Sequence, residues 1–132
     1  MTVGSFMTIK KRPDFVRLFT KGRYAAKSGL VVQAILRPDD EKAKYGDAVR
    51  VGFTATKKIG HAVVRNRSKR RLRALCAEIL PQYAVAGADY NFIARAATPD
   101  ADFESLRADA AAALKRLRSD LATVRENADE RA

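Results

Sequence analysis

The spacing of apolar residues near the start of the chain predicts a helix. Phe15, Leu18 and Phe19 fall three and four residues apart, which places them on one face of a helix over residues 13–20. A proline suits the first turn of this helix, and Gly22 stands where helices are commonly stopped. The pattern therefore indicates a short amphipathic helix.

Strand patterns follow this helix. Residues 23–26 predict a short extended segment, and residues 30–36 are a nearly continuous apolar run that indicates a mostly buried strand. Turn residues at 37–41 end that strand, and the polar stretch up to residue 47 is predicted to be a loop. Residues 50–56 then predict a strand that has alternate apolar residues on one face.

Two longer helical patterns surround one more strand in the rest of the chain. Gly60 precedes a helix predicted over 62–80, which Pro81 is expected to close. The buried stripe of this helix is expected to comprise Val64, Ser68, Leu72, Leu75, Cys76 and Ile79. Residues 89–94 predict a strand, and residues 102–124 predict the last helix. The apolar stripe of the last helix comprises Phe103, Leu106, Ala110, Leu114, Leu117, Leu121 and Val124.

These elements predict an α+β fold of one domain. Their order is helix, two or three strands, helix, strand, helix, which is typical of helices packed on one small sheet. A chain of 132 residues that is 47% hydrophobic suits one modest core. We expect the domain to span residues 9–125, with residues 1–8 a disordered extension and residues 126–132 a charged tail.

Charge narrows the class of partner. The net charge is +11, and the basic excess lies in residues 1–73, whereas residues 74–132 hold more acids than bases. A field of this sign attracts polyanions, either nucleic acid or an acidic membrane surface. No apolar run approaches the ~20 residues of a membrane span, and no signal-peptide pattern opens the sequence. The single cysteine, Cys76, suits a reducing compartment, so we expect a cytoplasmic protein with Cys76 buried.

The candidate chemistry is concentrated in residues 51–77, which contain no acidic side chain. Like charges at helical spacing repel one another, and bound phosphates would relieve that repulsion, because arginine matches their oxygens with a planar fork. Opposite the apolar stripe of the predicted helix lie Asn66, Arg67, Arg70 and Arg73, flanked by Lys69. Arg65 and Arg71 lie nearer the stripe, so one of them is expected to be partly structural. The alternative is a solvated basic face.

Two lysines lead into this helix. Lys57 and Lys58 precede Gly60, which allows a turn, and a helix start offers free backbone N–H groups and a positive dipole end. His61 is the only histidine, and no carboxylate or nucleophile accompanies it, so we expect a surface or capping role. The sequence has neither metal-ligand spacing nor a Walker A or dinucleotide-binding glycine pattern.

Phe15 and Phe19 have two interpretations. Aromatic residues at helical spacing are more often part of a core. These two, however, lie among Lys10, Lys11, Arg12, Arg17 and Lys21. Aromatic rings among cations form the platforms on which single-stranded nucleic acid stacks, at ~1–3 kcal/mol per base. One ring can face the core while the other faces a groove.

The run from Arg50 to Arg73 closely resembles the signature of the bacterial ribonuclease P protein family. Its core is Arg-Asn-Arg-x-Lys-Arg at residues 65–70, after a Lys-Lys-x-x-x-Ala lead that starts at Lys57. Two flanking segments agree. The stretch Asp14-Phe15-x-x-x-Phe19-x-x-Gly22-Arg23 is similar to the family's first helix, and Asp89-Tyr90-x-x-Ile93-Ala94-Arg95 is similar to its fourth strand. The resemblance covers about residues 9–117.

The resemblance implies a fold and a partner. The fold has the order α-β-β-β-α-β-α around a small central mixed sheet, with a left-handed βαβ crossover (ribonuclease P protein-like, similar to the second domain of ribosomal protein S5). The function implied is that of the protein subunit of ribonuclease P, whose catalytic RNA uses Mg²⁺ to remove the 5′ leader of precursor tRNA. We also expect a monomeric protein that is inactive alone, binds no cofactor or metal of its own, and has neither DNA nor membrane as partner.

Site residues carry over from the resemblance by position. The residues expected to contact the catalytic RNA are Lys57, Lys58, Arg65, Asn66, Arg67, Lys69, Arg70 and Arg73. Those expected to line a cleft for the leader of precursor tRNA are Phe15, Phe19, Val32, Gln33 and Thr54. The position of Gln33 is often aromatic in the family, so the resemblance does not imply base stacking at that point.

Three other functions stay open at this point. A general RNA-binding or ribosomal protein would share the charge but would not activate a ribonuclease P RNA at low magnesium. A protein nuclease would cut RNA alone, although a lone histidine in a basic segment argues against it. A DNA-binding regulator would place the basic helix in a major groove, but no helix-turn-helix pattern frames that helix.

Overall fold

The computed structural model of the chain describes residues 2–3, 6–38 and 42–131. The strands are β1 (Thr2–Val3), β2 (Phe6–Thr8), β3 (Arg23–Ala26), β4 (Leu30–Leu36), β5 (Arg50–Thr54) and β6 (Ala88–Ala94). The helices are α1 (Arg12–Lys21), α2 (Lys42–Tyr45), α3 (Ala62–Tyr83) and α4 (Phe103–Arg131), with a 3-10 turn η2 (Lys57–Ile59) before α3.

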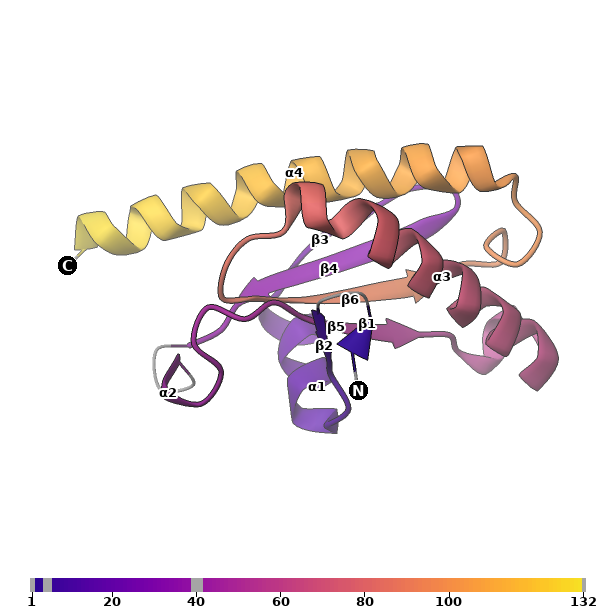
Figure 1. The fold of residues 1–132 in the computed structure, drawn as a ribbon, viewed down its shortest axis with the longest axis horizontal. Helices are drawn as coiled ribbons and strands as arrows, with labels where there is room; N and C mark the ends of the chain where they lie inside the picture. Colours follow the sequence, from indigo (N-terminus) through magenta and orange to yellow (C-terminus); the bar gives the residue numbers. More distant parts are fainter. Residues whose placement is uncertain (1, 4–5, 39–41, 132) are drawn as a thin grey trace.

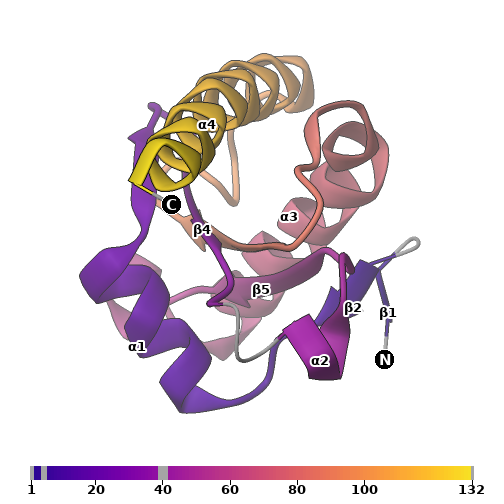
Figure 2. The same ribbon diagram turned by 90° about the vertical axis from the view of Figure 1, so that its left-hand side faces the viewer.

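The strands form one mixed sheet in the order β1-β2-β5-β6-β4-β3. β5 and β6 are adjacent and parallel, and α3 connects them by a left-handed crossover (Figure 1). β4 pairs antiparallel with β6, and β3 pairs antiparallel with β4. α3 and α4 cover one face of the sheet and α1 lies on the other (Figure 2). The predicted α+β order α-β-β-β-α-β-α is therefore confirmed, and the structure adds β1, β2 and α2.

The hydrophobic core fills the space between the sheet and the two long helices. Alternate residues of the central strands point toward these helices, and the register places Val32 beside Phe92 and Phe92 beside Phe53. The helices contribute apolar stripes close to those predicted, with Ser68, Leu72, Leu75, Cys76, Ile79 and Leu80 buried in α3. Val64 at the start of the α3 stripe is only half-buried.

Helix α1 begins and ends as predicted, but Gly22 acts through close approach rather than through an unusual backbone angle. Pro13 occupies the first turn, and the N–H of Gly22 donates to Leu18 O at 3.0 Å. The φ of Gly22 is −74°, which any residue adopts. A Cβ at this position would lie 2.4 Å from Leu18 O, so only glycine fits where the strand β3 follows α1 directly.

The N-terminus differs from the prediction. Residues 1–8 were expected to be a disordered extension, yet β2 pairs parallel with β5 through Met7↔Arg50 and Thr8↔Val51. The side chain of Phe6 joins the core cluster and is 8% exposed. The sheet edge at β5 offers unpaired backbone groups, and this segment satisfies them. Residues 1, 4 and 5 of the predicted extension lie outside the described residues.

Three boundaries downstream also differ. Pro81 lies inside α3 and does not close it. Proline removes one N–H donor, and here the carbonyl that loses its partner belongs to Ala77, an exposed residue that water can reach. The helix α4 continues to Arg131, past the predicted end at 124 and through most of the predicted tail. The predicted loop after residue 36 contains α2, and residues 39–41 lie outside the described residues.

Candidate nucleic-acid interface

The turn η2 and the first half of α3 present a basic surface. Gly60 separates them with φ +142°, a value that favours glycine, and a Cβ there would lie 3.0 Å from Val64. Ser68 is buried and its hydroxyl donates to Val64 O at 2.9 Å, which fixes the opposite side of α3 against the core. The residues exposed on the outer side are Lys57, Lys58, Asn66, Arg67, Arg70 and Arg73, with Lys69 and Arg65 half-buried.

Most of these cations keep their charge available. Arg67 lies 3.7 Å from Asp100, but the two side chains are 53% and 84% exposed, and an ion pair this exposed contributes little. The guanidinium of Arg73 lies 5.5 Å from the ring centre of Phe53, a contact that orients the group without neutralising it. The surface therefore carries uncompensated positive charge.

Arg71 is the structural arginine of this helix. Its Nη1 donates to Thr98 O at 2.7 Å and its Nη2 donates to Ala101 O at 2.6 Å. These bonds tie α3 to the loop that precedes α4. The prediction that either Arg65 or Arg71 is partly structural is confirmed in Arg71.

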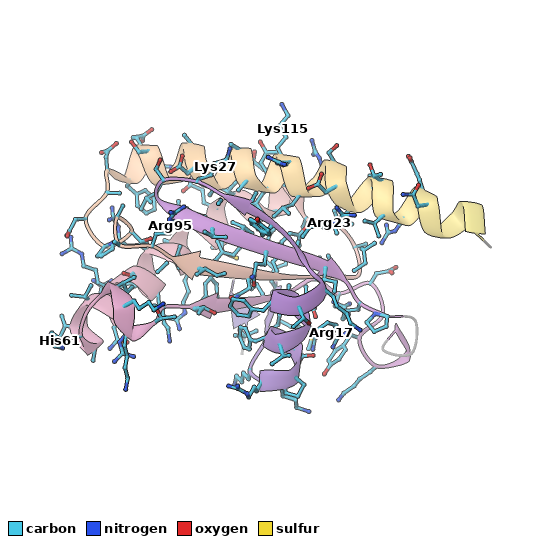
Figure 3. The ribbon with its side chains drawn as sticks, turned by 180° about the vertical axis from the view of Figure 1, so that it is seen from behind. Arg17, Arg23, Lys27, His61, Arg95 and Lys115 are labelled. Atoms are coloured by element: carbon cyan, nitrogen blue, oxygen red, sulfur yellow. The ribbon has the colours of Figure 1, made fainter. Side chains whose placement is uncertain are left out.

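Arg65 lies at a hollow where the basic surface begins. Lys57, Lys58, His61 and Arg65 line this hollow, whose volume is about 620 Å³. The Nε of Arg65 is buried and has no hydrogen-bond partner among the described residues. His61 is the N-cap residue of α3, but its side chain makes no capping hydrogen bond and projects from the helix start (Figure 3). Of the two roles predicted for His61, the structure shows the surface role, because the side chain is exposed and makes no capping bond.

A separate cleft of about 380 Å³ lies between α1 and the end of β5. Three of the residues predicted for the leader cleft, Phe15, Phe19 and Thr54, line it together with Lys69 of α3. The other lining residues are Lys10, Arg12, Phe53 and Ala55. Lys69 therefore belongs to both regions, and the cleft adjoins the basic surface of α3.

The two aromatic rings of α1 divide between core and surface. Phe15 is half-buried and packs on Gly52 of β5, where a Cβ would lie 2.5 Å from the ring. Phe19 is 56% exposed. Gly52 thus creates the space in which Phe15 is seated, while Phe19 offers its ring to the cleft. The sequence left this division open.

Two residues predicted for the leader cleft are placed elsewhere. Val32 is 0% exposed and faces the core under α3 and α4, because alternate residues of a strand point to opposite faces. Gln33 lies on the α1 side but is 8% exposed. Its Oε1 accepts from Asn91 Nδ2 at 3.2 Å, and Asn91 Oδ1 accepts from Thr54 Oγ1 at 3.0 Å. The prediction for Val32 is wrong, and Gln33 belongs to a polar row beneath the cleft that sequence analysis missed.

A buried ion network holds α1 on the sheet. Asp89 of β6 accepts from Arg50 Nε at 2.8 Å, from Arg50 Nη2 at 2.6 Å and from Arg37 Nη1 at 2.9 Å. Arg50 also lies 3.4 Å from Asp14 of α1, which pairs with Arg17 at 2.8 Å. Burial alone would lower the pKa of Arg50, but the hydrogen bonds and charge of Asp89, with Asp14, raise it above its ordinary value. The only sign of this network in the sequence is that charged residues stand at or next to the ends of apolar strands, as Arg37, Arg50 and Asp89 do.

The family model described as Ribonuclease P matches residues 4–118, which is most of the chain. The chain belongs to the ribonuclease P protein family. The matched region includes the residues of both the cleft and the basic surface of α3. The end of α4 lies beyond the matched region.

Relatives in the ribonuclease P protein family are similar in sequence to this chain along most of its length. The "Ribonuclease P protein component" of Caulobacter vibrioides is 44% identical over 116 residues, which cover 88% of this chain and 74% of that protein. The protein of the same name from Paramagnetospirillum magneticum is 43% identical over 109 residues, covering 83% and 80%.

Solved ribonuclease P proteins share the fold. The Staphylococcus aureus RNase P protein superposes with a TM-score of 0.65 at 30% identity and covers 82% of this chain and 92% of its own. The protein from Thermotoga maritima superposes with a TM-score of 0.66 at 25% identity, covering 83% and 96%. None of the described helices is both long and apolar enough to cross a membrane.

Proposed function

We propose that this chain binds the catalytic RNA of ribonuclease P and the 5′ leader of precursor tRNA, and so assists removal of the leader to give the mature tRNA 5′ end. The observation that carries the proposal is the junction at Lys69, where the aromatic cleft meets the basic surface of α3. One surface suits the phosphates of a folded RNA, and the other suits an unpaired strand. A protein that joins two RNAs needs both.

The basic surface contributes affinity by replacing counterions. Arginine and lysine that neutralise phosphates release the ions condensed on RNA, so affinity falls with salt. If ~5 phosphates are engaged, the logarithm of affinity should fall against the logarithm of salt with a slope near −3 to −5. The exposed positions of Asn66, Arg67, Arg70 and Arg73 support this role, as does the buried Nε of Arg65, for which no described residue supplies a hydrogen-bond partner.

The cleft holds the leader by stacking and by charge. Phe19 offers an exposed ring, and Lys10, Arg12 and Lys69 line the same space. Every base has a face that can stack, so such a cleft tolerates varied leader sequences. The protein thereby keeps the leader extended away from the bond that is cut.

The proposal assigns the hydrolysis to the RNA subunit and its Mg²⁺. The protein's own buried carboxylates Asp14 and Asp89 are engaged by arginines, and the single histidine is exposed at the start of α3. Neither arrangement suits a general base beside an RNA phosphate. We also propose that the free protein is monomeric and cytoplasmic, since a net charge of +11 opposes self-association without RNA.

The proposal is tested with precursor tRNA at low magnesium in three samples: ribonuclease P RNA alone, this protein alone, and the mixture. Cleavage in the mixture only, with a mature 5′ end, is the expected result. Cleavage by the protein alone would identify a protein nuclease. If the mixture were no more active than the RNA alone, the assisting role would be refuted. General RNA binding would then be the function that remains.

A further inference from the structure

A second groove lies along the free edge of the sheet, on the side of α1 away from α3. It has a volume of about 560 Å³ and runs beside β3, bordered by Arg23 and Tyr24 of that strand and by Arg116 and Asp120 of α4. β3 is the last strand of the sheet, so one row of its backbone groups is left without a strand partner. No function stated above uses this groove.

The groove carries the features of a single-strand site. Tyr24 is 66% exposed, more than any other aromatic residue among the described exposed apolar side chains. Arg23 and Arg116 are exposed, and neither forms an ion pair with a described residue. Among the described residues that line the groove, Asp120 is the one acid, and it is half-buried. Tyr24 is paired with Gln33 and so points to the α1 side of β3, whereas Arg23 lies on the α4 side of the same strand. An exposed ring and two guanidinium groups without a described ion pair therefore border one groove, a combination that binds unpaired nucleic acid.

The groove follows directly on the leader cleft. Gly22 is the only residue between α1 and β3, and Arg23 lies directly above α1 in Figure 3. Tyr24 is five positions after Phe19 in the sequence, so their Cα atoms are at most about 18 Å apart. A strand that leaves the cleft past Phe19 therefore reaches Tyr24 within a few nucleotides.

A polyanion fits this edge better than a second copy of the chain does. Antiparallel pairing of β3 with its own copy would bring the arginines of two grooves, Arg23 and Arg116 of each chain, into one interface. Two chains of net charge +11 would add a general repulsion. Single-stranded RNA supplies the opposite charge and also a base for Tyr24.

We propose that the groove between β3 and α4 is a second subsite for single-stranded RNA, which binds the part of the precursor tRNA leader upstream of the part held in the cleft. This inference rests on the proposed function. Tyr24 stacks on a base, while Arg23 and Arg116 contact the phosphates on either side. The subsite makes affinity depend on leader length.

The test compares two precursor tRNAs, one with a leader just long enough to fill the cleft and one several nucleotides longer, bound to the reconstituted holoenzyme. Wild-type protein should bind the longer leader more tightly. Tyr24→Ala should lower the affinity for the long leader by about 5- to 150-fold, the range for one lost base stack. Tyr24→Phe should retain it. Neither change should alter binding of the short leader.

Charge is tested separately with a matched pair of α4 variants. Arg116→Ala should reduce the salt slope for the long leader by about 0.7, the value for one phosphate contact on a single strand. Lys115→Ala removes the same charge from the adjacent residue, which points away from the sheet (Figure 3), and should leave the slope unchanged.

Two outcomes overturn the inference. The first is a wild-type protein that activates cleavage yet shows no gain with leader length, or a gain that survives Tyr24→Ala and Arg116→Ala. The second is a change in the mass of the free protein in these variants without a change in leader affinity, which would make the edge an interface between copies. Failure of the short-leader substrate to respond to wild-type protein would instead contradict the proposed function.

Discussion

Replacing Asp89 by alanine should destabilise the fold more than any change on the basic surface. The carboxylate accepts three N–H bonds from Arg37 and Arg50, and the three side chains are 1%, 5% and 1% exposed for Arg37, Arg50 and Asp89. Alanine would leave two buried guanidinium groups without their shared partner. Removing one member of a buried pair costs about 3–5 kcal/mol, because the remaining charge stays buried.

The lower end of that range applies here. Arg50 keeps Asp14 at 3.4 Å, and Arg37 keeps backbone carbonyl acceptors at Gly46, Ala48 and Ala88. We therefore expect a loss of about 3 kcal/mol from a total stability that is about 5–15 kcal/mol for domains of this kind. With a urea dependence of about 1–3 kcal/mol per molar, the midpoint should fall by roughly 1–3 M.

Urea unfolding followed by circular dichroism measures this loss directly. Asp100→Ala is the matched control, since it removes a carboxylate from the exposed Arg67 pair and should cost less than about 1 kcal/mol. Asp89→Asn keeps the shape and should fall between the two. Equal midpoints for Asp89→Ala and Asp100→Ala would refute the reasoning, because they would show that the buried network contributes no more than a surface pair.

Further predictions concern the cleft, the basic helix and the thiol. Gly52→Ala should displace the ring of Phe15, lower the free energy of unfolding by about 1–3 kcal/mol and weaken leader binding. An unchanged melting temperature would contradict the close packing of Phe15 on Gly52. Arg70→Ala should weaken assembly with the catalytic RNA and reduce the salt slope of that assembly by about 0.7–0.9, without lowering the melting temperature. Arg71→Ala should instead lower the melting temperature, because it removes the two hydrogen bonds to carbonyls of the loop before α4. The opposite result for the two variants would show that their roles are exchanged. Burial raises the pKa of Cys76 to about 12, so its contribution to stability is complete below about pH 9 and is lost as the pH rises toward 12. A thiol reagent at pH 8 should modify Cys76 only at the rate of unfolding, and rapid modification of the folded protein would refute its burial.

The sequence determined the order of the main helices and strands from α1 to α4, without α2, and the exposed basic side of α3. The apolar stripes of α3 and α4 repeat at helical spacing and the strands show their own patterns, so burial on one face could be predicted. The same logic placed Arg67 and Arg70 on the outer side of α3, and the absence of acids in 51–77 identified the charge of the partner. These are local properties, since each depends on residues within one element.

Tertiary structure decided what depends on contacts between distant segments. The pairing of β4 with β6 determines which side of the sheet Val32 faces. The position of the Phe15 ring depends on the space left by Gly52, which lies on a different element. Pro81 inside α3 shows the same dependence, because packing against the core sustains the helix past a local stop signal.

The strand β2 and the groove at β3 depend on which strands become edges of the sheet, and the order of strands in a sheet is not a property of any one segment. The buried pairing of Asp89 with Arg37 and Arg50 joins residues 52 and 39 positions apart. In the sequence each of these charged side chains is compatible with exposure to solvent. They pair because the sheet buries them side by side, and a buried charge without a partner would be strongly unfavourable.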